Sequence, residues 1–530
     1  MKRFYLMLLV AATFFFNTQL FAQESNSNFS GQVTDSKGIA LPGTIISIKH
    51  IPTGFETKTQ SNTKGYFYVP NLPVGGPYTI NFTFVGKRTE TKIDYNLSLG
   101  ANALNVRLSD QSATLADVMV TSKKAGGLKN SAGVQIGQSQ IRTMPTINRS
   151  LQDVTRITPQ SNNNSFVGTN FRYNNVTIDG AINNDAIGFS PSLGGQTNSS
   201  GQAGSSTRTN PVSLDAIQDV QVYLAPFDVK IGNFLGGSIN AVTRSGTNEF
   251  HGSVYGYGRG AFLVGPNNAG DKSKEPSDFY DYQTGVRFGF PLIKDKLFFF
   301  TNEEITRRQD PVILGAGSAD NTIITSAQAF SIDSLFKTKY GIAGGAGAYG
   351  NTSIYSKSNK FFNRLDWVIN ANNRLSIRNN TITSEATNLE RDQQNFRFGS
   401  IDFKQINNQT STVLELKTKF NNSVSNSLIL GYSNIHDYRE PTSNSALPQI
   451  EVSSNGGTIF LGTDREASIF NMKQKTYEFT DNVTINKGIN TFTLGTHNEF
   501  YDITYGFVNA WNGRVAYSSV NDLLNNNPNR

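Results

Sequence analysis

Apolar and polar side chains alternate along the second half of the chain, from Glu249 onward. In one segment, Leu414 and Leu416 alternate with Glu415 and Lys417. Neighbouring side chains on a strand point to opposite faces, so such a strand has one apolar and one charged face. Strands of about ten residues with this pattern are typical of a membrane β-barrel, which has hydrocarbon outside and water within. We therefore expect the charges of this region to face a barrel lumen.

The connections between these segments alternate in length as well. Short turns are expected at residues 293–296, 370–373, 421–423 and 487–488, whereas the other gaps are long and rich in Asn, Ser and Gly. Outer-membrane barrels have short periplasmic turns and long outer loops, while a soluble sandwich favours short loops at both ends. The pattern predicts nine strands, near residues 250–260, 281–291, 297–306, 360–370, 374–383, 411–420, 424–435, 474–486 and 489–505.

Nine strands do not complete a barrel of the expected kind. Bacterial single-chain barrels use even numbers, and barrels that enclose a plug have about 22 strands. We expect the chain to be the N-terminal part of a larger barrel protein; the alternative is a wrongly placed first strand and a small barrel. Nine strands alone would leave an open edge in lipid, so we expect no functional pore from these residues by themselves.

The N-terminus carries the pattern of a signal peptide. Lys2 and Arg3 precede an apolar stretch over residues 4–16, and cleavage is expected after Ala22. The apolar run is shorter than the roughly 20 residues of a transmembrane helix. The chain has no cysteine, which excludes disulfides, a lipid-modified N-terminal cysteine and thiol chemistry.

The composition of the chain favours a β-rich fold, and its charge pattern and motif content argue against several classes of function. The length of 530 residues suggests two to four domains, and the aromatic content of 11% with abundant Asn, Ser, Thr and Gly suits a β-rich fold. The net charge of +7 comes without a basic block, so nucleic-acid binding is not expected. No Gly-x-Ser-x-Gly, His-Glu-x-x-His or Gly-Lys-Ser/Thr motif is present in the sequence.

The titratable residues also give no pattern of a catalytic or metal site. Glu303 and Glu304 are neighbours on a predicted strand and point to opposite faces, so they cannot act as a pair. We expect no enzyme, no metal and no cofactor, because the histidines are widely scattered: His50, His251, His436 and His497.

The first mature region, residues 29–110, is expected to be a small β-sandwich. Short β-prone runs at residues 44–49, 66–69, 78–85 and 103–108 are separated by Gly and Pro turns. Residues 31–35, Gly38, residues 41–43 and residues 63–67 resemble the carboxypeptidase regulatory-like domain. This resemblance implies a transthyretin-like sandwich that serves as an appendage and carries no catalysis.

Residues 115–248 form a second region with both strand and helix signals. Residues 139–157 mix helix formers with apolar residues, residues 172–180 read as a strand that ends in an Asp-Gly turn, and further runs lie at 217–223 and 236–248. In this order the runs resemble the plug of TonB-dependent receptors, and most closely the Oar-like branch found in Bacteroidetes. Ala225 and the residues after Asp228 depart from the family's common pattern, so a siderophore-type substrate does not follow.

The resemblance assigns roles to two sets of residues. The TonB box, which would pair as an added strand with the partner TonB, is Asp117, Val118, Met119, Val120 and Thr121. Candidate ligand-binding residues, where plug loops meet the lumen, are Phe171, Arg172, Tyr173, Asn174, Asn183, Asn184 and Asp185. For Arg172 and Asp185 the alternative is pairing with charges of the barrel wall. The polar stretch at residues 190–210 is either a ligand-sampling loop or a disordered insertion.

The sequence thus predicts an all-β dominated protein: a signal peptide (1–22), a transthyretin-like sandwich (29–110), a TonB box with an α+β plug (115–248), and part of a large antiparallel transmembrane β-barrel (249–530). The resemblance implies an outer-membrane receptor that imports an unknown external ligand with energy from TonB, with its N-terminal domain in the periplasm. Expected partners are TonB, outer-membrane lipid and the ligand, with a surface lipoprotein as a further candidate. The alternative is a non-energised outer-membrane adhesin or secretion channel.

Overall fold

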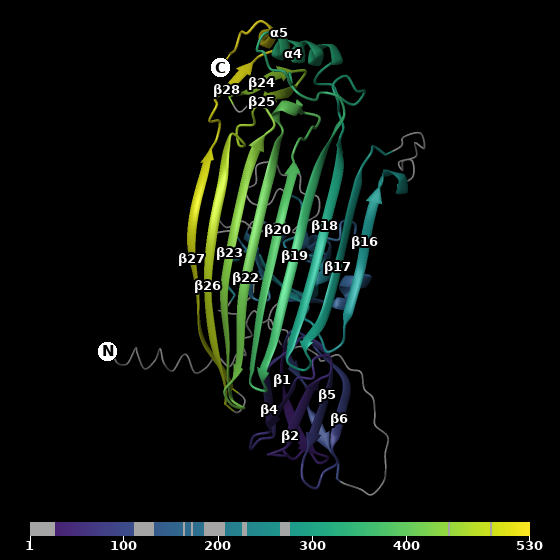
Figure 1. Cartoon of the computed structure of the whole chain (residues 1–530), viewed down its shortest axis with the longest axis vertical. Coiled ribbons are helices and arrows are strands. Elements are labelled where there is room, and N and C mark those ends of the chain that lie inside the picture. The colour runs from purple at the N-terminus through teal and green to yellow at the C-terminus, as the bar shows by residue number, and fades with distance from the viewer. Residues whose placement is uncertain are drawn as a thin grey trace, which may run out of the picture.

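A computed structural model describes residues 27–110, 132–162, 165–170, 173–184, 207–224, 231–264, 276–443, 446–487 and 490–529. The largest unit is a tall antiparallel sheet that curves around a small mixed domain, the plug (Figure 1). A β-sandwich lies at one end of this sheet, and a folded cap of helices and short strands lies at the other end. The predicted fold class, β-dominated with a sandwich, a mixed domain and a large antiparallel sheet, is confirmed.

The large sheet has nine strands that follow one another in chain order. They are β16 (His251–Gly260), β17 (Tyr280–Ile293), β18 (Leu297–Val312), β19 (Thr352–Asn370), β20 (Asn373–Thr387), β22 (Phe403–Lys419), β23 (Val424–Pro441), β26 (Ile469–Lys487) and β27 (Asn490–Val508). All nine predicted strands are present, and three of the predicted short connections, at residues 293–296, 370–373 and 421–423, lie where they were expected. The fourth, at residues 487–488, includes Gly488, which lies outside the described residues. Most strands extend further toward the long connections than predicted. The prediction followed the alternation of apolar side chains, and this alternation ends before the backbone hydrogen bonds between the strands end.

The alternation along the strands separates two faces of the sheet. On β19, Phe361 and Trp367 are exposed on the outer face, whereas Lys360 is 2% exposed on the inner face. On β22, Glu415 is also buried, and its carboxylate lies 3.1 Å from the ammonium of Lys417. The charged side chains of these strands therefore lie on the inner face, as predicted, and this face contacts the plug.

The sandwich packs two sheets over an apolar core. One sheet contains β4 (Tyr66–Leu72), β1 (Ser27–Asp35) and β7 (Gly100–Ala103), with β8 (Val106–Leu108) also paired to β1. The other contains β3 (Glu56–Gln60), β2 (Ile45–His50), β5 (Gly75–Thr83) and β6 (Glu90–Leu97). Phe29, Tyr78 and Phe82 are fully buried between the sheets, and Phe29 and Phe82 both contact the ring of Phe67.

The plug is a five-stranded sheet with two short helices. The strand order is β13 (Ala181–Ile182), β12 (Asn175–Ile178), β15 (Gly237–Thr243), β14 (Ile217–Leu224) and β9 (Ala132–Gly137), with α2 (Gln138–Thr143) and α3 (Leu151–Thr155) beside it. The predicted Asp-Gly turn joins β12 to β13, with φ of 47° at Asp179 and 81° at Gly180. The plug core includes Phe300 and Phe362 of the large sheet, so the two units share packing.

The cap at the long-connection end is a folded unit that the sequence reading missed. It contains α4 (Ser326–Thr338), β21 (Asn395–Arg397), β24 (Gln449–Ser454), β25 (Gly457–Gly462), β28 (Arg514–Tyr517) and α5 (Val520–Leu524), built around its own apolar cluster. Thr325 and Gln328 form a capping box at the start of α4, and this Thr-x-x-Gln signal could have revealed the helix. Where the structure describes the chain, none of its helices is long and apolar enough to span a bilayer.

Candidate functional site

The plug is held inside the sheet by buried charged groups, and Asp179 is the centre of the first cluster. Its carboxylate lies 3.2 Å from Arg378 and 3.7 Å from Arg364, which project from β20 and β19. The backbone and hydroxyl of Thr243 each donate a hydrogen bond of 2.7 Å to it. Burial alone would raise the pKa of Asp179, but the two guanidinium groups and Thr243 hold it below its ordinary value.

A second cluster joins the plug to β18 at Glu304. Its carboxylate is 2% exposed and lies 2.7 Å from the ammonium of Lys360. The hydroxyl of Ser213, from the plug, donates to the same carboxylate at 2.7 Å, and the hydroxyl of Tyr255 donates at 3.2 Å. The plug therefore contacts the wall through a series of charge-assisted hydrogen bonds in addition to its apolar contacts.

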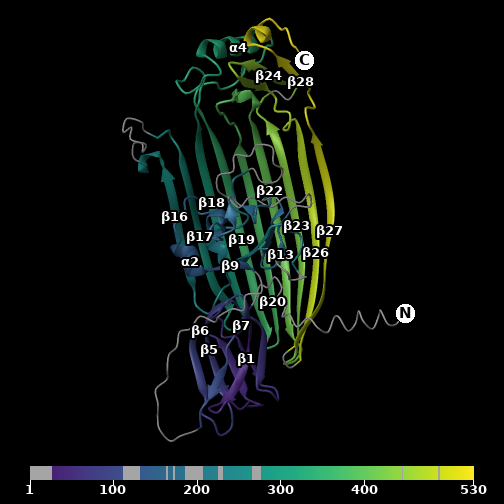
Figure 2. The same cartoon turned by 180° about the vertical axis from the view of Figure 1, so that it is seen from behind.

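Four of the predicted ligand residues lie in the described part of the plug (Figure 2 shows its position inside the sheet). Asn174 is buried, and its carbonyl accepts a hydrogen bond from the amide of Asn184 at 3.1 Å. The Asn183 side chain borders a cavity of about 10 Å³ at the wall, room for one water molecule. Tyr173 is 48% exposed.

The structure thus brings Asn174 and Asn184 together as parts of the plug hairpin, while Tyr173 stays exposed. The remaining predicted ligand residues, Phe171, Arg172 and Asp185, lie outside the described residues. The predicted TonB box, residues 117–121, also lies outside them.

The cap contains a polar pocket of about 500 Å³ that sequence reasoning did not identify. Arg397, Arg465 and Arg514 line it together with Asp402 and other carboxylates. Burial raises the pKa of Asp402 to about 6, although its carboxylate accepts backbone hydrogen bonds from Asn388 and Phe403. These residues are far apart in the sequence, and only the folding of the long connections brings them to one place.

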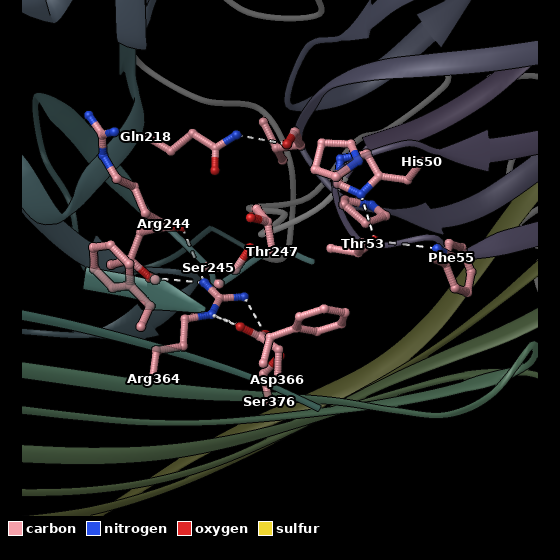
Figure 3. Close-up of a pocket in the computed structure, with 18 of the residues that line it drawn as sticks. His50, Thr53, Phe55, Gln218, Arg244, Ser245, Thr247, Arg364, Asp366 and Ser376 are labelled. Atoms are coloured by element: carbon pink, nitrogen blue, oxygen red, sulfur yellow. Dashed lines mark hydrogen bonds and ion pairs between the residues drawn. The ribbon is translucent and has the colours of Figure 1, made fainter. Parts of the chain in front are cut away.

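A second large cavity, of about 480 Å³, lies where the sandwich, the plug and the short-turn ends of the strands meet (Figure 3). We call it the basic cavity, because five basic side chains line it: Arg244, Arg287, Arg364, Arg374 and Lys417. Asp366 is its only lining carboxylate among the described residues, and it binds the guanidinium of Arg364 at 2.8 Å.

The sandwich forms one wall of the basic cavity through His50 and its neighbours. Nδ1 of His50 lies 2.7 Å from the hydroxyl of Thr53, and its ring centroid lies 4.7 Å from that of Tyr78. Burial, followed by the positive charge of Arg374, lowers the pKa of His50 to about 3. His50 is therefore neutral at physiological pH.

Several contacts fix the sandwich to the other two units. The amide of Gln218, on the plug, donates to the carbonyl of Val74 at 2.8 Å. Arg374, on β20, donates to the carbonyl of Asn71 and lies 4.9 Å from the ring centroid of Phe55. The sandwich thus contacts plug and wall at the same time.

Comparisons with known proteins give consistent matches. The carboxypeptidase regulatory-like domain family matches residues 28–109, and the outer membrane beta barrel domain family matches residues 242–329. The chain is 24% identical over 405 residues to the TonB-dependent transporter Oar of Myxococcus xanthus, which covers 71% of this chain and 35% of Oar.

Solved outer-membrane proteins are also similar. The outer membrane transporter YddB from Escherichia coli matches with 14% identity and a TM-score of 0.46, over 73% of this chain and 50% of that protein. The siderophore receptor PirA from Pseudomonas aeruginosa matches with 11% identity and a TM-score of 0.44, over 71% of this chain and 49% of that protein. The chain spans half or less of the length of each of these relatives. The chain is therefore similar to the TonB-dependent transporter Oar over 71% of its length, and it contains one region that matches the carboxypeptidase regulatory-like domain and another that matches the outer membrane beta barrel domain.

Proposed function

We propose that this chain supplies the plug and the first wall strands of a transporter that binds an external ligand and imports it with energy from TonB. The observation that carries the proposal is the seating of the plug against the inner face of the sheet through Asp179 and Glu304. Charged and hydrogen-bonding groups of the plug and of the wall can exchange their partner for water. Part of the surface exposed when the plug separates is therefore polar and can be hydrated.

In this proposal the sandwich and the short turns face the periplasm, and the cap faces the outside. An external ligand would first meet the cap, whose polar pocket carries charges of both signs. Deeper in the lumen it would meet the predicted plug residues, Tyr173 among them. The ligand remains a polar molecule of unspecified class, since both sets of residues offer amides, hydroxyls and charges.

The central test is whether TonB pairs with residues 117–121. The chain has no cysteine, so a single introduced cysteine reports one position without background. We expect V118C to form a disulfide with a cysteine introduced into the partner-binding edge of TonB. K124C, which lies after the predicted box, should form much less. Equal cross-linking at both positions, or at neither, would discard the TonB-box assignment.

A substitution tests the consequence for transport. Val118→Pro removes a backbone donor that an added strand needs, so we expect TonB-dependent uptake to be lost while the protein still inserts into the membrane. Lys124→Pro is the matched control and should transport normally. Normal uptake in Val118→Pro would favour the non-energised channel or adhesin instead.

A further inference from the structure

The basic cavity holds more positive than negative charge. Two further arginines lie beside the five lining cations. Arg149 shares the carboxylate of Asp215 with Arg287, and Arg378 shares that of Asp179 with Arg364. Against these cations, the carboxylates within 4 Å in the described part of the chain are Asp179, Asp215, Asp366 and Glu415. A partly enclosed space with this imbalance is electrostatically costly unless an anion enters it.

Two of the cations account for most of the imbalance. Arg244 and Arg374 have no carboxylate within 4 Å among the residues that the structure describes. Each instead donates to a backbone carbonyl, Arg244 to Ile217 at 3.1 Å and Arg374 to Asn71. Burial and the nearby charge of Arg287 lower the pKa of Arg244 to about 10, which leaves it charged at neutral pH.

All three units contribute side chains to the same space, and the cations come from the plug and the wall. Arg244 follows β15 of the plug, Arg374 is the second residue of β20 of the wall, and the sandwich adds the neutral ring of His50. Figure 3 shows Arg244, Arg364 and His50 around this space. Guanidinium groups present planar pairs of donors that match the oxygens of phosphate and carboxylate groups.

We propose that the basic cavity binds an oxyanion, a phosphate or carboxylate group, that bridges the plug, the wall and the sandwich. The cavity volume of about 480 Å³ accommodates a small molecule that carries such a group. The anion neutralises the excess charge at the junction, so the sandwich docks more tightly when the site is filled. This site is separate from the external ligand site of the proposed transport function.

Binding of inorganic phosphate and of succinate to the full protein in detergent tests the proposal, with sodium chloride at equal ionic strength as the reference. We expect saturable binding of at least one of the two by calorimetry, and a rise in the unfolding temperature with its concentration. Phosphate binding alone would assign a phosphoryl ligand, and succinate binding alone a carboxylate ligand.

Substitutions locate the binding. Arg244→Gln and Arg374→Gln should each weaken binding about tenfold or more, because each removes charge-assisted hydrogen bonds. Arg107→Gln, at an exposed position on the sandwich, should bind as the unaltered protein does. Arg244→Lys keeps the charge and should retain part of the affinity, which separates loss of charge from misfolding. The proposal is overturned if neither anion binds saturably, or if both glutamine variants bind with unchanged affinity.

Discussion

The sandwich core and the plug–wall interface are built on opposite principles. The sandwich closes around apolar side chains such as Phe29 and Phe82, which are fully buried between two sheets. The interface between plug and wall also has apolar packing at Phe362, but Asp179 and Glu304 contribute buried charges to it. An apolar core loses its stabilisation when it opens, whereas charged groups regain water. In the proposed function, the sandwich therefore stays folded while the plug separates from the wall.

The largest effect should come from the sandwich core. Phe82→Ala removes a fully buried ring and should cost about 3–5 kcal/mol of the free energy of unfolding of this unit. Hydrogen exchange at the amides of β2 and β5 in the full protein measures the loss. The 94% exposed Val85 is the control position, where Val85→Ala should change stability by less than about 0.5 kcal/mol. An equal loss of protection in the plug would mean that the two units do not unfold separately.

The next effect sharpens the other half of the comparison. Asp179→Asn keeps the shape of the side chain but leaves Arg364 and Arg378 without the charge they share, at a cost of about 3 kcal/mol. We expect the plug to become protease-sensitive at a lower urea concentration while the strands remain folded. Asp278→Asn, at an exposed site, is the control. Unchanged protease resistance in Asp179→Asn would show that the Asp179 cluster does not contribute to retaining the plug.

The effect of pH separates the sandwich from the charged interface by another route. The pKa of His50 is about 3 in the folded sandwich and near 6.5 in an unfolded chain, so the unfolded chain binds the extra proton between these values. The free energy of unfolding should therefore fall by about 1.4 kcal/mol for each pH unit below about 6.5, and level off near pH 3. Amide exchange of β2 as a function of pH measures this. His50→Gln should remove this part of the pH dependence; if it does not, another group is responsible.

The smallest effect concerns the contact between the two regions. Gln218→Ala removes the hydrogen bond to the carbonyl of Val74 and should weaken docking of the sandwich by about 1 kcal/mol. Protection of the sandwich from proteolysis measures the docked population, and oxyanion binding in the basic cavity should increase it. Thr91→Ala, on the sandwich away from the plug, is a control for effects on the sandwich itself, followed by hydrogen exchange. If the sandwich of Gln218→Ala is protected from proteolysis as well as that of the unaltered protein, the hydrogen bond does not contribute to docking.

Some of these features followed from local sequence pattern. The nine strands and their short turns were predicted because a lipid-facing strand must alternate, and a turn of two to four residues leaves a clear gap in that alternation. The Asp179-Gly180 turn was predicted because both positions need a positive φ. The cap was missed because α4 and the short strands around it come from segments more than a hundred residues apart in the chain. Each segment is too short to show a sustained alternation of apolar and polar residues.

The sequence by itself determined the class of each region: sandwich from turn-separated β runs, barrel wall from alternation, and the inward direction of Glu415 and Lys417 from side-chain parity. Only the tertiary structure decided which charges meet. Asp179 faces Arg378 across about two hundred residues, and Arg244, Arg374 and His50 share one cavity although they belong to three units. The physical reason is that periodicity fixes the face on which a side chain lies, whereas the partner on that face depends on how separately folded surfaces pack together.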